Sequence, residues 1–166
     1  MVNKNNQQML IGAALLFRDY RGKRQYLVIK GKDDGAWEVP KVIVRRGESS
    51  VRAVIRMTGE QIGITARVLE EVGRGSGLVN LNGKSVPQKH YYYLMMQRAK
   101  GGEILGFNDF TWLEFDKACK KLDLKKEKDI LKNSKPILKE WEKTKKYKMV
   151  EEEEAKALEE SLAQVA

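Results

Sequence analysis

The sequence predicts an α/β domain with a helical C-terminal extension, and three observations carry this prediction. Two strand-like runs are joined by a polar turn, a capped helical stripe follows them, and two further strand-like runs meet at an Asn-Gly turn. The 166 residues, 42% of them apolar, are enough for one globular domain with its own core. We expect the domain over residues 1–148 and an acidic helical tail over residues 149–166.

The N-terminal half carries signals for two strands and one helix. The runs "QQMLIGAALLFRD" and "KRQYLVIKG" read as strands, and the turn between them contains Gly22. In "GESSVRAVIRMTGEQIG" either Ser49 or Ser50 can cap the helix, and Gly63 falls where a helix-ending glycine belongs. Apolar positions at helical spacing predict the buried face of this helix: Val51, Val54, Ile55, Thr58 and Ile62.

The C-terminal half carries signals for a hairpin and then for helices. "ITARVLEEVG" is strand-like, and "GLVNLNGKSVPQKHYYYLMMQRA" predicts a hairpin that turns at Asn82-Gly83. The tyrosines at 91–93 must then point to alternate faces of the sheet. "FTWLEFDKACKKL" predicts the start of a helix, and Pro136 either begins a new helix or kinks one long helix.

The net charge of +9 is unevenly distributed along the chain. Residues 149–166 hold six Glu and one Lys, whereas residues 117–148 hold thirteen Lys against five acids. A basic segment of this kind attracts polyanions, so RNA or an acidic protein is a candidate partner. A solvated lysine-rich helix surface explains the pattern equally well. In the tail, Leu158, Leu162 and Val165 form one apolar stripe. The tail is then a helix that pairs with the basic segment or with a partner, or else its helix frays.

The sequence predicts a cytoplasmic protein that does not enter a membrane. Its longest apolar stretch, residues 9–17, is too short to span a bilayer, and no signal-peptide cleavage pattern follows it. The single cysteine, Cys119, cannot form an internal disulfide, which suits a reducing compartment.

Four segments together resemble the Nudix hydrolase superfamily: "AWEVPK", "RRGESSVRAVIRMTGEQIGI", "HYYYLM" and "FTWLEFDKACKKL". The family signature is Gly, five residues, Glu, seven residues, then Arg-Glu-apolar-any-Glu-Glu-any-Gly-apolar. The order of these segments, roughly from Leu10 to Leu138, is similar to the branch that hydrolyses diadenosine tetraphosphate and other dinucleoside polyphosphates. The resemblance implies an α/β/α sandwich with a mixed β-sheet.

Aligned with this signature, the chain keeps three of its functional residues. Glu48, Arg56 and Glu60 stand in their slots. In the family such acids bind Mg²⁺ or Mn²⁺, and Glu48 commonly supports the arginine. If the chain is an enzyme, the resemblance therefore implies that these three residues serve catalysis and that Glu60 is the remaining metal ligand.

Other slots of the signature are altered. Val42 stands in the glycine slot, Met57 in the first Glu slot and Gln61 in the last Glu slot. Positions i, i+3 and i+4 share a helix face, so acids at 57, 60 and 61 would form one patch. Magnesium requires oxygen ligands, chiefly carboxylates, yet methionine has no oxygen and glutamine offers a neutral amide. Glu103 or Asp109 could supply a displaced acid, but the sequence favours loss of ordinary hydrolysis.

Cationic and aromatic residues near the signature favour a phosphate-bearing ligand instead. The candidate ligand-binding residues are Lys41, Arg45, Arg46, Arg52, Trp37 and Tyr92. Guanidinium groups match phosphate oxygens and aromatic rings stack on bases, although surface solubility and loop packing are competing explanations.

We therefore expect a Nudix-fold protein that binds a nucleotide or dinucleoside polyphosphate and hydrolyses it weakly or not at all. One alternative is an active Mg²⁺-dependent pyrophosphohydrolase that uses displaced acids. The other is a non-catalytic module that interacts with RNA or a ribonucleoprotein.

Overall fold

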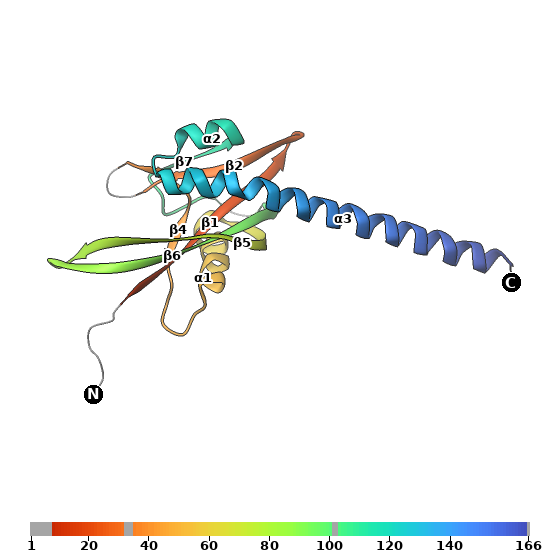
Figure 1. The fold of residues 1–166 in the computed structure, drawn as a ribbon, viewed down its shortest axis with the longest axis horizontal. Helices are drawn as coiled ribbons and strands as arrows, with labels where there is room; N and C mark the ends of the chain where they lie inside the picture. The colour runs from red at the N-terminus through yellow and green to blue at the C-terminus, as the bar shows by residue number, and fades with distance from the viewer. Residues whose placement is uncertain (1–7, 32–34, 101–102, 166) are drawn as a thin grey trace. The chain divides into compact units, whose positions relative to one another are not determined.

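A seven-stranded mixed sheet forms the centre of the fold (Figure 1). The computed structural model describes residues 8–31, 35–100 and 103–165. Its elements, in chain order, are β1 (Met9–Tyr20), β2 (Lys23–Lys30), β3 (Trp37–Glu38), β4 (Lys41–Ile43), α1 (Ser50–Met57), the π-helical turn η1 (Thr58–Ile62), β5 (Ile64–Leu81), β6 (Lys84–Lys100), β7 (Asp109–Glu114), α2 (Phe115–Lys121) and α3 (Lys125–Val165). The strand order is β3-β2-β1-β6-β5, with β4 also paired to β1 and β7 to β2. Strands β1 and β6 run parallel, whereas β1 and β2 run antiparallel, which confirms the predicted mixed sheet.

Two tight turns set the register of the antiparallel hairpins. Arg21 and Gly22 join β1 to β2 with φ values of 51° and 76°, and Asn82 and Gly83 join β5 to β6 with 52° and 77°. Two-residue turns with positive φ match the twist of the flanking strands, and Asn and Gly adopt them at low steric cost. Both predicted hairpins are confirmed. Strand β5 already begins at Ile64, so two segments that looked separate in the sequence form one strand.

Helices cover both faces of the sheet, as adjacent tyrosines of β6 demonstrate. The Tyr93 hydroxyl is hydrogen-bonded to Ser50 at the start of α1, whereas the Tyr92 hydroxyl donates to Glu127 in the first turns of α3. Consecutive strand residues point to opposite faces, so α1 and the start of α3 lie on opposite sides of the sheet (Figure 1). The predicted α/β/α sandwich is confirmed.

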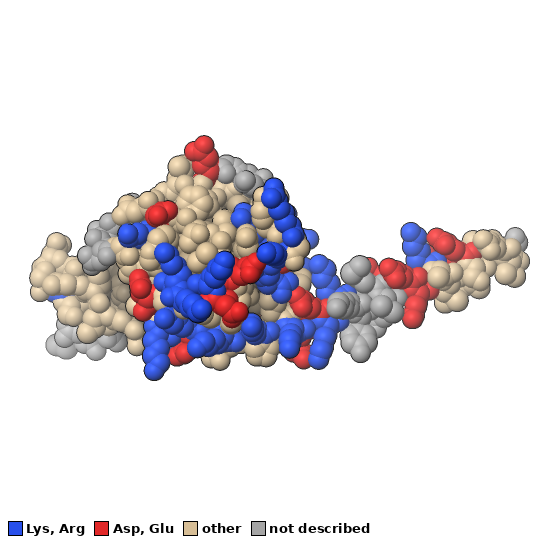
Figure 2. Space-filling view, turned by 90° about the horizontal axis from the view of Figure 1, so that it is seen from above, with Lys and Arg blue, Asp and Glu red and all other residues tan. Residues whose placement is uncertain are grey.

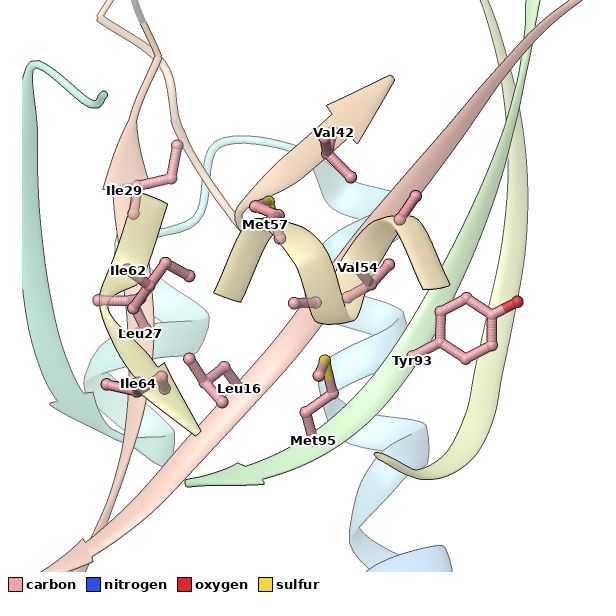
Figure 3. Packing of buried hydrophobic residues seen from close by; sticks show 12 residues of the cluster. Leu16, Leu27, Ile29, Val42, Val54, Met57, Ile62, Ile64, Tyr93 and Met95 are labelled. Atoms are coloured by element: carbon pink, nitrogen blue, oxygen red, sulfur yellow. The ribbon is translucent and has the colours of Figure 1, made fainter. Parts of the chain in front are cut away.

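The main core lies between α1 and the sheet (Figure 3). Ser49 caps α1 by accepting a hydrogen bond from the Arg52 N–H, and Gly63 ends η1 with a φ of 71°. The side chains of this segment that are buried are Ala53, Val54, Met57, Thr58 and Ile62. The prediction that Ile55 is buried was wrong, since it lies about 100° around the helix from Val54 and is 49% exposed.

Two glycines let helices approach the sheet closely. A Cβ on Gly12 of β1 would lie 2.6 Å from Cγ2 of Val54 in α1 and 3.1 Å from the Ser50 carbonyl oxygen. A Cβ on Gly73 of β5 would lie 2.9 Å from side-chain carbons of Ile130 in α3. The contacts of 2.6 Å and 2.9 Å are shorter than those that real Cβ atoms show, so a neighbour must move before either position can hold a side chain.

Gly12→Ala should therefore destabilise the protein by about 1–3 kcal/mol, because α1 must move off β1 to admit the methyl group. Chemical unfolding with urea measures this loss. Gly59→Ala is the matched control, since its added Cβ has nothing within 4 Å. This control should stabilise the protein by roughly 0.4–1 kcal/mol. If both alanine variants were equally stable, α1 would not pack on β1 as described.

The C-terminal part of the chain differs from its prediction in one element. The residues "DFTWLE" form strand β7, which pairs with β2, and the helix begins only at Phe115. Pro136 lies inside a single helix, α3. The chain divides into two compact units, Met1–Lys132 and Asn133–Ala166, while the predicted boundary at residue 148 stays a prediction. None of the described helices is long and apolar enough to span a membrane.

Candidate functional site

A pocket of about 540 Å³ opens beside the C-terminal end of α1. Its described lining comes from the ends of β2 to β4, from α1 with η1, and from the loop before β7. These residues are Ile29, Gly31, Glu38, Lys41, Val42, Ile43, Arg45, Arg56, Gln61, Gly106 and Phe107. A smaller pocket of about 310 Å³ adjoins it, shares Glu38 and Lys41 with it, and adds Gln88 and His90.

Arg56 and Glu48 form a two-pronged ion pair at the edge of the larger pocket. The Arg56 Nε donates to one Glu48 carboxylate oxygen at 3.0 Å and its Nη2 to the other at 3.1 Å. The Arg45 backbone N–H also donates to Glu48, and Arg56 Nη2 donates to the Ile43 carbonyl. The Arg56 hydrogen bonds hold the pKa of Glu48 below its ordinary value, and Glu48 raises the pKa of Arg56. The pair thus holds the loop after β4 against α1. Because its pKa is lowered and its oxygens already accept hydrogen bonds, Glu48 is poorly suited to act as a base.

The three acid slots of the signature do not share one face. Met57 is fully buried in the core beside the sheet, the Glu60 side chain is 59% exposed, and Gln61 lines the pocket. The expected patch assumed α-helical spacing, but residues 58–62 form a π-helical turn, in which each residue rotates less around the axis. Glu60 lies 3.8 Å from Arg56 Nη1 across this turn.

Val42 and Met57, which replace the glycine and the first acid of the signature, belong to the same apolar cluster (Figure 3). Val42 is 9% exposed and Met57 is fully buried. The two replacements therefore act together, because both side chains add apolar atoms to the cluster next to the pocket.

The donor atoms around the pocket do not fit a divalent cation. Among residues 8–31, 35–100 and 103–165, no group of three or more His, Cys, Asp or Glu side chains is placed to hold a metal ion. Glu103 and Asp109, the candidates for a displaced acid, are exposed and do not line the pocket. Glu38 is the carboxylate on its described wall, and it is bound to Lys41 at 2.9 Å.

Lys41 belongs to a buried polar network that the sequence did not reveal. Its Nζ lies 2.7 Å from the carboxylate of Glu127, a residue only 1% exposed. Glu127 also accepts hydrogen bonds from the Val39 N–H at 3.1 Å and the Tyr92 hydroxyl at 2.9 Å. Glu127 stands in a lysine-rich segment far along the chain, where nothing in the local pattern marks it as buried. The network anchors Lys41 between the two pockets.

The structure separates the other predicted ligand-binding residues. Arg45 is exposed and lines the pocket, whereas Arg46 and Arg52 are exposed but lie outside its wall. Trp37 is half-buried, with the Lys121 ammonium 4.4 Å from its ring centroid, and it does not line the pocket. Tyr92 is 2% exposed, so its ring offers no face to a ligand.

His90 lies in the smaller pocket and remains neutral near pH 7. Its Nε2 is 3.0 Å from the Gln88 side-chain oxygen. Burial lowers the pKa of His90, and the nearby Lys41 charge lowers it further. A neutral imidazole here has one N–H donor and one acceptor nitrogen and adds no charge to the site.

Comparisons with a family model and with solved structures show what the chain is similar to. The model of the NUDIX domain family matches residues 9–139, well over half of the chain. No curated protein matches the chain by sequence. A binary complex of C. elegans Ap4A hydrolase is similar in structure, with a TM-score of 0.64 and 22% identity over 78% of this chain and 97% of that chain.

Two further solved structures share the fold. The NUDIX domain of Shewanella oneidensis NrtR, in complex with ADP ribose, has a TM-score of 0.60 and 17% identity over 80% of this chain and 90% of its own. The E. coli dihydroneopterin triphosphate pyrophosphohydrolase has a TM-score of 0.57 and 11% identity over 74% and 91%. The family match and the shared fold lead to one conclusion: this chain belongs to the Nudix family.

Proposed function

We propose that this Nudix protein binds a nucleotide or dinucleoside polyphosphate in the larger pocket and does not hydrolyse it at an appreciable rate. One observation carries the proposal: the slot of the first acid holds Met57, whose side chain is fully buried in the core. Nudix enzymes generally use divalent metal ions, and metal-assisted attack on a phosphoanhydride needs several oxygen ligands around those ions. The side chains described here do not provide them.

Phosphate recognition depends on the cations of the pocket wall. Two of them, Lys41 and Arg56, already form ion pairs with carboxylates. The exposed Arg45 therefore supplies the main guanidinium contact to phosphate oxygens in this proposal, because its fork matches two oxygens at once. The neighbours support the ligand class, since one is an Ap4A hydrolase and another is complexed with ADP ribose.

Calorimetry with diadenosine tetraphosphate, ADP-ribose and ATP, in EDTA and then with Mg²⁺, tests the proposal. We expect at least one ligand to bind in EDTA, because fixed cations and not a metal hold the phosphates. Arg45→Ala should weaken binding about 10- to 100-fold, the magnitude of one charge-assisted hydrogen-bond pair. Arg46→Ala and Arg52→Ala are matched controls that should leave affinity nearly unchanged, because neither side chain lines the pocket.

Two other results would contradict the proposal and favour the alternatives. Nucleotide release that requires Mg²⁺ or Mn²⁺ and is lost in Glu60→Gln would establish an active pyrophosphohydrolase. Steeply salt-dependent RNA binding that persists in Arg45→Ala, with no nucleotide binding, would favour an interaction module based on the lysine-rich segment 117–148.

A further inference from the structure

The last part of α3 has an apolar stripe that faces solvent. Leu158, Leu162 and Val165 are 63%, 64% and 84% exposed, and their spacing of four and three residues places them on one helix face. Figure 2 shows acidic and uncharged side chains together along these last turns. Large apolar side chains repeated on one exposed face are typical of a helix that pairs with another helix.

The charges of the second unit change sign at its middle. Residues 133–148 hold six Lys and two Glu, whereas residues 151–166 hold six Glu and one Lys. Side by side in a parallel pair, two such helices would place Lys against Lys and Glu against Glu. In an antiparallel pair each basic half faces an acidic half, which is the attractive arrangement.

Apolar positions give the same register as the charges. Ile137 and Trp141 of the basic half are half-buried and, like Leu158 and Leu162, are four residues apart. If Leu158 of one copy lies opposite Trp141 of the other, then Leu162 lies opposite Ile137, and the two-fold axis crosses between residues 149 and 150. This axis also falls at the boundary between the basic and acidic halves. The sign change of the charges and the apolar spacing thus place the two-fold axis at the same point.

We propose that two copies of this chain associate through their second units, as an antiparallel helix pair centred between residues 149 and 150. Such a pair is isologous, so the same surface of each copy forms both halves of the interface. Thirty-three helical residues extend about 50 Å, which provides a long but thin contact. Because few apolar side chains take part, the association depends strongly on charge and therefore on salt.

Sedimentation equilibrium of the full chain over a range of protein concentrations tests the proposal. We expect a monomer–dimer equilibrium whose dissociation constant rises between roughly 0.1 M and 1 M salt, as the Debye length falls from about 10 to 3 Å. Leu158→Glu combined with Leu162→Glu should raise that constant at least about a hundredfold. Leu78→Glu combined with Leu105→Glu is the matched control, since both leucines are also more than half exposed but lie in the first unit.

A charge exchange tests the antiparallel orientation. One variant carries Glu152→Lys, Glu153→Lys and Glu154→Lys, and the other carries Lys139→Glu, Lys143→Glu and Lys145→Glu. We expect each variant alone to be monomeric, because its two halves now have the same sign. An equimolar mixture should form a heterodimer, because each half then meets the opposite charge.

A pair of cysteines tests the register directly. Thr144→Cys combined with Ala155→Cys, in a Cys119→Ser background, should form an intermolecular disulfide under mild oxidation, because the register places these positions opposite each other. Within one helix they are about 16 Å apart, too far for a disulfide. Thr144→Cys with Ser161→Cys should crosslink poorly. A chain that stays monomeric at low salt, or a dimer that Leu78→Glu with Leu105→Glu disrupts instead, would overturn the proposal.

Discussion

Met57→Glu is expected to destabilise the protein by about 3–5 kcal/mol, the cost of an uncompensated buried charge, although it restores an acid of the family signature. Met57 has no exposed surface and belongs to the cluster between α1 and the sheet. A carboxylate there would lose its hydration and would find hydrocarbon in place of hydrogen-bond donors. Urea unfolding of the variant, with Met57→Leu as the isosteric control, measures the loss. Met57→Leu should cost less than about 1.5 kcal/mol.

The pH dependence of this variant follows from the same burial. Burial raises the pKa of a carboxyl group, so the folded state of Met57→Glu holds its proton more tightly than the unfolded chain. Stability is therefore greatest below the unfolded pKa of about 4.3 and is lost as the pH rises through the raised folded value. Unfolding at roughly pH 5 and pH 8 should give the larger destabilisation at pH 8. A variant that is stable at both values and cleaves diadenosine tetraphosphate with Mg²⁺ would show that residue 57 faces the pocket.

Glu127→Ala is expected to cost a similar amount, about 3–5 kcal/mol, because it removes the acceptor of two buried donors and one of the two carboxylates that bind Lys41. The Lys41 ammonium, the Tyr92 hydroxyl and the Val39 N–H all bind Glu127. Glu127→Gln keeps one acceptor oxygen and the same shape, so we expect a smaller loss. Urea unfolding compares the two variants, and a loss below about 1 kcal/mol in Glu127→Ala would mean that water replaces the carboxylate at little cost.

Tyr92 makes the contribution of this network to the free energy of unfolding depend on pH at high pH. Burial is the main cause that raises the pKa of Tyr92, and the Glu127 charge and hydrogen bond raise it further. A raised folded pKa contributes stability that is present below the unfolded value of about 10 and is lost as the pH rises above it. Tyr92→Phe should therefore flatten the decline of stability above about pH 10, although it removes a hydrogen bond at neutral pH.

Local sequence signals predicted much of the fold. Gly22, Asn82-Gly83 and Gly63 mark chain reversals or helix ends through positive φ, which is a property of the residue itself. Strand β7 was missed because "FTWLE" has no clear alternation of its own. Its strand conformation comes from pairing with β2, whose paired residues lie 79 to 89 positions earlier in the chain. A single sequence does not show such long-range pairing.

The candidate site was less predictable than the fold. The Arg56–Glu48 pair followed from the family resemblance, and the structure places the two side chains together. The sequence did not predict that the Met57 side chain points into the core. The π-helical turn that separates it from Glu60 and Gln61 has no signal in the residue pattern. Glu127 was missed for a different reason, because a glutamate among lysines normally lies on a solvated helix surface.

The neighbouring tyrosines of β6 have a consequence for how the first unit comes apart. The Tyr93 hydroxyl is hydrogen-bonded to the first residue of α1, and the Tyr92 hydroxyl is hydrogen-bonded to α3, so two adjacent residues of β6 connect both helices to the sheet. Separation of either helix from the sheet would break one of these hydrogen bonds and would disturb the adjacent tyrosine, which contacts the helix on the opposite face. The two layers should therefore melt together in one cooperative step, and the amides of residues 92–95 should exchange with solvent only when the whole unit opens.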